Sequence, residues 1–196
     1  MRRELGKAVR KRFEARLKRE APQFLPATTQ EVPAGCRGFV WPIAPDLSAF
    51  LLLVISRENR FTVEGALSRD GRFPGQSLPI SPEDCMVNLN VHGICRFRIA
   101  GLWRPRGIDP WWEVIPRPSS SELDDRLDRI VRGEDEYSSI EIEKALQRVE
   151  PLVDDAVQRT VSVVVPFFAR VARSLGVSMR DDGSPPSAGS EGGGLR

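Results

Sequence analysis

The sequence contains few of the residues that commonly ligate metals or act as nucleophiles. It has one histidine, His92, and three cysteines, Cys36, Cys85 and Cys95, with no C-x-x-C pair among them. A single histidine excludes metal sites that need two, such as the HExxH zinc motif. An odd number of widely spaced cysteines predicts reduced thiols rather than a disulfide framework.

These four residues would satisfy the ligand count of a zinc site with three cysteines and one histidine. The alternation expected around them, however, places His92 and Cys95 on opposite faces of a strand, and apolar residues surround Cys95. The same geometry argues against a Cys–His nucleophilic pair. We therefore expect no metal site and no cofactor.

Long apolar segments are also missing. The longest unbroken apolar run, 49–55, is far shorter than the ~18 residues that a membrane helix needs. The first twenty residues are highly charged and no apolar segment follows them, which is unlike a secretory signal. No glycine-rich phosphate-binding loop and no GxSxG motif occurs. These absences favour a soluble, cytoplasmic protein without membrane contact, and a non-catalytic role over an enzyme.

The formal net charge is only +2, but the charges are unevenly distributed. Residues 1–20 carry nine basic and three acidic side chains, whereas residues 118–155 carry five basic and twelve acidic ones. We expect the acidic helices near the C-terminus to dock against the basic N-terminal helix. The basic surface is then either a solvated helix face or a contact for nucleic acid or a membrane surface.

Hydrophobic periodicity predicts the main elements. Apolar residues at four-residue spacing predict a helix over 2–20. The stretch from Leu47 to Ser68 reads as a β-hairpin at the centre of the core, its first strand buried on both faces and its second on one. Short strands are expected over 37–43 and 111–115. Alternation over 87–103 predicts one bent strand or two strands, with the bend near Gly93.

Helical spacing returns after Pro116. The run Ser119–Glu122 is expected to cap a short helix, and Ser138 or Ser139 a longer one that Pro151 and Pro166 interrupt or bend. The whole pattern predicts an α+β protein: an antiparallel sheet of about four to six strands, with an N-terminal helix and C-terminal helices packed on one face. Residues 1–176 are expected to form a single domain, and the Gly/Ser/Pro-rich residues 177–196 a disordered tail.

One polar face stands out as a candidate binding site. It comprises the even-numbered residues of the alternating segment and a carboxylate of the hairpin: Glu64, Asn88, Asn90, His92, Arg96 and Arg98. These residues are either the wet face of an antiparallel sheet, with cross-strand ion pairs, or a surface for an acidic or phosphate-bearing partner. The adjacent Trp111 and Trp112 are expected on opposite faces of a strand, so one of them lies outside the main core.

Three functional hypotheses follow. The first is a small non-catalytic binding or regulatory module with a protein partner, acting through the sheet face or the C-terminal helices. The second is a nucleic-acid-associated protein that uses the N-terminal helix together with Arg96 and Arg98. The third is an enzyme built on carboxylates and arginines, with Glu64, Asp70 and His92 beside Arg96 in one pocket. The sequence leaves the oligomeric state open.

Overall fold

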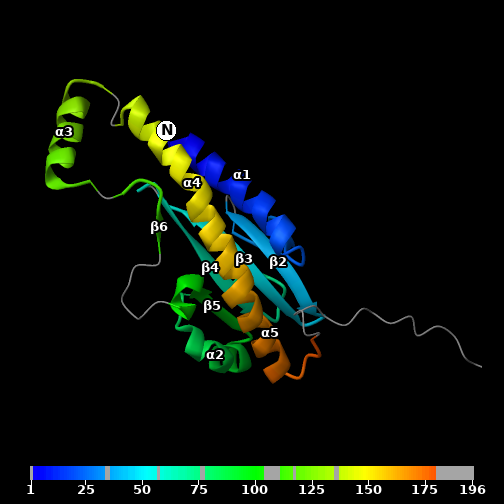
Figure 1. The fold of residues 1–196 in the computed structure, drawn as a ribbon. Helices are drawn as coiled ribbons and strands as arrows, with labels where there is room; N and C mark the ends of the chain where they lie inside the picture. Colours follow the sequence, from blue (N-terminus) through cyan, green and yellow to red (C-terminus); the bar gives the residue numbers. More distant parts are fainter. Residues whose placement is uncertain are drawn as a thin grey trace, which may run out of the picture.

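The computed structural model describes residues 2–33, 36–56, 58–75, 78–103, 111–116, 118–134 and 137–179. Helix α1 (Arg2–Glu20) comes first, a six-stranded antiparallel sheet follows, and further helices complete the chain (Figure 1). This arrangement confirms the predicted α+β architecture. The strands are β1 (Leu25–Pro26), β2 (Arg37–Ala44), β3 (Leu47–Ile55), β4 (Arg60–Ser68), β5 (Ile94–Arg98) and β6 (Trp112–Glu113).

The sheet runs in the order β1-β2-β3-β4-β5, and β6 pairs with β4 beyond the end of β5. The expected hairpin is β3–β4, and β3 lies in the middle of the sheet, as predicted. Gly65 on β4 pairs with Phe97 on β5, and a Cβ atom at position 65 would lie 2.8 Å from the Phe97 ring. Glycine therefore allows this ring to lie across β4.

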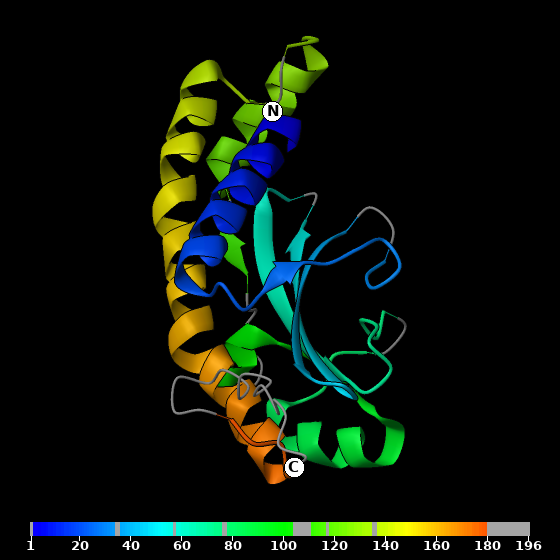
Figure 2. The same ribbon diagram turned by 90° about the vertical axis from the view of Figure 1, so that its right-hand side faces the viewer.

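Helices cover one face of the sheet, as Figure 2 shows. The apolar stripe of α1 (Leu5, Val9, Phe13 and Leu17) is buried against it, as the spacing predicted. Helix α4 (Ser139–Arg159), a π-helical turn (Thr160–Val164) and α5 (Val165–Ser174) follow along the same face. Pro151 lies inside α4 without ending it, and the wide π turn precedes Pro166, whose nitrogen cannot donate a hydrogen bond.

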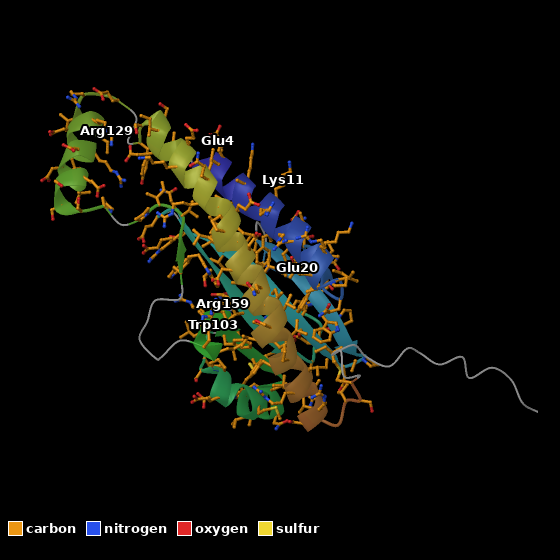
Figure 3. The ribbon with its side chains drawn as sticks, in the orientation of Figure 1. Glu4, Lys11, Glu20, Trp103, Arg129 and Arg159 are labelled. Carbon is orange, nitrogen blue, oxygen red and sulfur yellow. A yellow bond between two sulfur atoms is a disulfide. The ribbon has the colours of Figure 1, made fainter. Side chains whose placement is uncertain are left out.

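Ion pairs join α1 to α4. Arg12 contacts Glu150 and Asp154, and Arg16 Nε lies 2.9 Å from Asp154 Oδ1. The expected docking of the basic N-terminal helix against an acidic helix is therefore confirmed for α4. Figure 3 marks Glu4, Lys11 and Glu20 along α1, beside α4.

The segment 87–103 differs from its prediction. It does bend at Gly93, which has a positive φ of 71°, but the half before the bend is helix α2 (Cys85–His92) rather than strand. Cys85 and Leu89, four residues apart, are buried, whereas Val87 and Val91 are exposed. The odd-numbered apolar residues thus matched a strand by coincidence. After Gly93 the chain forms β5 and a 3₁₀ turn (Ile99–Leu102).

The cysteines also differ from the expectation of reduced thiols. Cys85 on α2 and Cys95 on β5 form a disulfide, with their Cα atoms 5.2 Å apart. The turn at Gly93 brings together two residues that sequence spacing did not suggest as a pair. Cys36 is free and exposed.

The second strand of the hairpin is buried on both faces, not on one. Thr62, Glu64 and Ser68 of β4 face away from the helices, yet each is at most 4% exposed. A second, smaller core covers this side. It consists of strand residues and residues from two loops: Val32, Val40, Phe50, Leu52, Ala66 and Phe73. The far face of the sheet is therefore not a wet surface along β4.

The predicted tail falls largely outside the described residues, which end at 179. Val177 and Met179 at its start are partly buried against the main core. That residues 1–176 form a single domain stays a prediction.

Candidate functional site

The six residues of the predicted binding face do not lie together. Glu64, Arg96 and Arg98 share the sheet face opposite the helices, as expected. Asn88, Asn90 and His92 lie instead on α2. Asn88 donates a hydrogen bond to the Asp84 carbonyl at the start of that helix, 3.2 Å away. The prediction of one continuous polar stripe is wrong because residues 88–92 are helical.

Glu64 and Arg96 form a buried cross-strand ion pair. Arg96 donates from Nη2 and Nε to Glu64 Oε2, at 2.8 and 3.1 Å, and from Nη1 to the Gly75 carbonyl at 3.0 Å. Its guanidinium also lies over the Phe73 ring. These contacts connect β4, β5 and the 73–75 loop. The pair therefore supports the alternative that these residues form cross-strand ion pairs instead of a binding surface.

Arg98 lies directly across from Glu64 in the β-ladder, and its guanidinium is 5.6 Å from the centre of the Trp111 ring. Arg60 contacts the same ring at 4.8 Å. Trp112 points to the opposite face, where it stacks on Phe61 and is buried. The prediction that the two tryptophans face opposite ways is confirmed. Because two guanidinium groups already contact Trp111, its ring is poorly suited to stacking on a nucleic-acid base.

The residues proposed for a carboxylate-based enzyme have other contacts. Asp70 accepts hydrogen bonds from the Ser68 hydroxyl and the Arg72 backbone; burial raises its pKa, but these bonds lower the pKa overall. His92 is exposed at the C-terminal end of α2. Among the described residues, no group of three or more His, Cys, Asp or Glu side chains is placed to hold a metal ion. The disulfide also removes Cys85 and Cys95 as zinc ligands.

Helix α3 (Ser120–Val131) carries a feature that the sequence did not reveal. Four large apolar side chains at helical spacing form a stripe that is 48–85% exposed to solvent: Leu123, Leu127, Ile130 and Val131. We call these four residues the α3 ridge. The spacing was visible in the sequence, but an amphipathic stripe normally faces the core. Nothing in the sequence distinguishes a stripe that is buried from one that is exposed.

Helix α3 is well formed despite its exposed stripe. A capping box begins it, in which Ser119 accepts a hydrogen bond from the Glu122 backbone and Glu122 accepts from the Ser119 backbone. These bonds hold the pKa of Glu122 below its usual value. The helix lies at the end of the molecule where α1 and α4 begin (Figures 1 and 2).

Glu141 anchors α3 to α4. It caps α4 by accepting hydrogen bonds from the Ser138 backbone and hydroxyl, and it also accepts from Arg126 Nη2 and Arg129 Nη1 of α3, at 3.2 and 3.1 Å. Arg126 in addition lies over the ring of Tyr137. Partial burial raises the pKa of Glu141, but the four hydrogen bonds outweigh it and lower the pKa to about 2. Figure 3 marks Arg129 on α3.

A pocket of about 270 Å³ lies between the first turns of α3 and the rest of the protein. Its walls are the segment after β6, α3 and α4, and its lining carries both charge signs: Glu122, Arg126, Glu141, Lys144 and Arg148. The contacts that hold α3 against α4 are thus polar, and the residues of the ridge take no part in them.

Comparison with protein-family models, curated proteins and solved structures finds no match for this chain.

The function is therefore inferred from the geometry alone. Within the described part of the chain, no helix combines the length and the apolar character needed to cross a bilayer.

Proposed function

We propose that this protein is a non-catalytic binding module and that α3 is its docking element for a partner protein. The observation that carries the proposal is the α3 ridge: four large apolar side chains, each at least 48% exposed, on one stripe of a capped helix. A contiguous exposed apolar stripe is typical of an interaction surface. The i, i+4, i+7, i+8 spacing matches the way an amphipathic helix enters the apolar groove of a partner.

The contrast with the other helices supports this function. The stripe of α1 is at most 3% exposed, and α4 and α5 bury most of their apolar residues against the sheet, although Ile140 and Leu146 of α4 are exposed. On α2 only the pair Val87 and Val91 is exposed in a similar way. Among the described helices, four exposed apolar residues on one stripe therefore occur only on α3.

The ion pairs between α3 and Glu141 also support the docking function. Two arginines of α3 are fixed to Glu141, so the ridge is presented in one orientation before any partner arrives. Such preorganisation lowers the entropy lost on binding.

Site-specific photo-crosslinking tests the proposal. A photo-reactive phenylalanine replaces Leu127 in the ridge of the full chain, and Asp125, on the opposite side of α3, provides the matched control. In the native host we expect a discrete adduct from position 127 that disappears when Leu123→Ser and Val131→Ser are added, and no such adduct from position 125. Equal labelling from both positions, or none from position 127, would contradict the proposal.

A second candidate function rests on a separate observation. Five cationic side chains of α1 are exposed and take part in no ion pair among the described residues: Arg3, Lys7, Arg10, Lys11 and Lys18. They lie on the side of α1 away from its buried stripe, which suits contact with a polyanion. Arg12 and Arg16 are already paired with α4. Retention on heparin that falls steeply with salt and is lost in Arg10→Glu/Lys11→Glu would support this role; no retention would end it.

The cytoplasmic location expected from the sequence stays a prediction.

A further inference from the structure

We infer that the partner of the α3 ridge presents an apolar seam with lysine or arginine along one edge. This inference rests on the proposed docking function and names the chemistry of its occupant. In a helix each residue turns by about 100°, so Asp124 and Asp128 lie along one edge of the ridge, beside Val131. Both aspartates are exposed, and neither takes part in an ion pair among the described residues.

The other edge of the ridge offers no free cation. Arg126 and Arg129 lie on the side of α3 that faces α4, where both form ion pairs with Glu141. Arg126 is also buried, with 9% of its surface exposed. The charged residues along the ridge that have no ion pair within the described part of the chain are therefore Asp124 and Asp128. A complementary partner carries basic residues where it meets this edge.

A second copy of this chain fits the ridge poorly. A two-fold axis perpendicular to two antiparallel α3 helices brings the same edge of each together, so Asp124 and Asp128 would face the same aspartates of the other copy. Like charges in these flanking positions disfavour pairing. In a pair of parallel α3 helices, the aspartate edge of one ridge would meet the Arg126 edge of the other. That edge is already in contact with α4.

Two other occupants are also disfavoured by charge and burial. The basic helix α1 of another copy has the required charge, but its apolar stripe is buried in its own core. An anionic lipid surface favours helices with a basic polar face, whereas the exposed edge of α3 is acidic. A separate protein with a basic-edged apolar seam remains the best match.

Designed helical peptides test this chemistry on the full chain. One peptide has a leucine seam with lysines along one edge, and a second has glutamates in the same places. Fluorescence anisotropy should show the lysine peptide binding about tenfold more tightly, since each peptide charge meets Asp124 or Asp128. The preference should reverse in Asp124→Lys/Asp128→Lys, shrink at high salt, and persist in the control variant Asp125→Lys/Glu143→Lys, whose charges lie away from the ridge.

The outcomes separate this inference from the proposed function. Equal binding of both peptides that is lost in Leu127→Ser would overturn the basic-edge inference and leave the ridge as a docking surface. Concentration-dependent dimerisation that Leu127→Ser abolishes, measured by sedimentation, would overturn it in favour of a second copy. Binding of neither peptide, or binding that Leu127→Ser leaves unchanged, would remove the docking function itself. Circular dichroism of Leu127→Ser confirms that α3 still folds.

Discussion

Replacing Glu141 by glutamine should release α3 from α4 while leaving α4 capped. A glutamine at this position still completes a capping box with Ser138. The change removes the negative charge that Arg126 and Arg129 share, at N···O distances of 3.2 and 3.1 Å, and leaves a neutral acceptor for Ser138. Glu141→Gln therefore removes both ion pairs and keeps the hydrogen bonds of the helix cap, which become weaker without the carboxylate charge.

The expected loss can be bounded from the geometry. Hydrogen bonds to charged groups contribute about 1.5–3 kcal/mol each when shielded from water, whereas exposed pairs contribute at most ~1 kcal/mol. The Glu141 side chain is 32% exposed, whereas Arg126 is at 11%. We expect a total of about 1–2 kcal/mol, which corresponds to roughly a 5- to 30-fold rise in the population with α3 undocked.

Acid should produce the same release in the wild type. The pKa of Glu141 is lowered from 4.5 to about 2, so its stabilising effect is complete above pH 4.5 and is lost as the pH falls toward 2. The Glu141→Gln variant has no carboxyl to protonate at this position. Its α3 should therefore lose no further ion pair to position 141 as the pH falls.

Amide hydrogen exchange measured by mass spectrometry checks both effects, because it reports local opening in α3 separately from unfolding of the sheet. Glu143→Gln is the control, since Glu143 is exposed and has no ion pair in the described part of the chain. Unchanged exchange of α3 amides in Glu141→Gln, or an equal effect of Glu143→Gln, would refute the reasoning.

Three further predictions concern the sheet and the cysteines. Arg96→Met should lower the free energy of unfolding in urea by about 2–4 kcal/mol because it leaves the buried Glu64 carboxylate without its partner, and adding Glu64→Leu should recover part of that loss. Gly65→Ala should cost about 1–3 kcal/mol in the same assay, since the new Cβ would lie 2.8 Å from the buried Phe97 ring. Alkylation without reductant should modify Cys36 alone, and reduction of the unfolded chain should expose two more thiols; three reactive thiols without reductant would contradict the disulfide.

The main architecture could be predicted because its apolar residues repeat unambiguously. Four buried residues at four-residue spacing define α1, and the apolar run 49–55 beside an alternating run defines the β3–β4 hairpin. Long amphipathic elements bury most of their stripes, so the sequence pattern and the core coincide. Charge also gave correct information, since the opposite net charges of the two ends reappear as the Arg16–Asp154 contact.

Short elements were harder, for a physical reason. Over eight residues, apolar side chains at positions 85, 87, 89 and 91 fit a strand of period two as well as a short helix. Packing decided the outcome, because only Cys85 and Leu89 enter the core and the Gly93 turn carries Cys95 back to them. Because this segment is a helix and not a strand, Asn90 and His92 do not lie on the predicted binding face.

The far face of the sheet shows a second limit. Glu64 was expected on a wet surface, but loop residues far away in the sequence, such as Val32 and Phe73, cover that side. Which loop covers which strand depends on tertiary contacts that a local pattern does not encode. Arg96 was therefore placed correctly beside Glu64, but its environment was not predicted.

The exposure of the α3 ridge could not be predicted, because local spacing does not show which tertiary contacts cover a helix. Its spacing is that of a core helix, and only the position of Glu141 shows why it faces water: the arginines on the other side of α3 are held against α4, which turns Leu127 outward. An exposed stripe of this size costs solvation free energy unless a partner covers it. The chain nevertheless fixes it with a cap at Ser119 and two ion pairs, rather than leaving the segment unstructured. Ordering a helix in order to keep its apolar side exposed is consistent with a docking surface, because a stripe that only served stability would be turned toward the sheet.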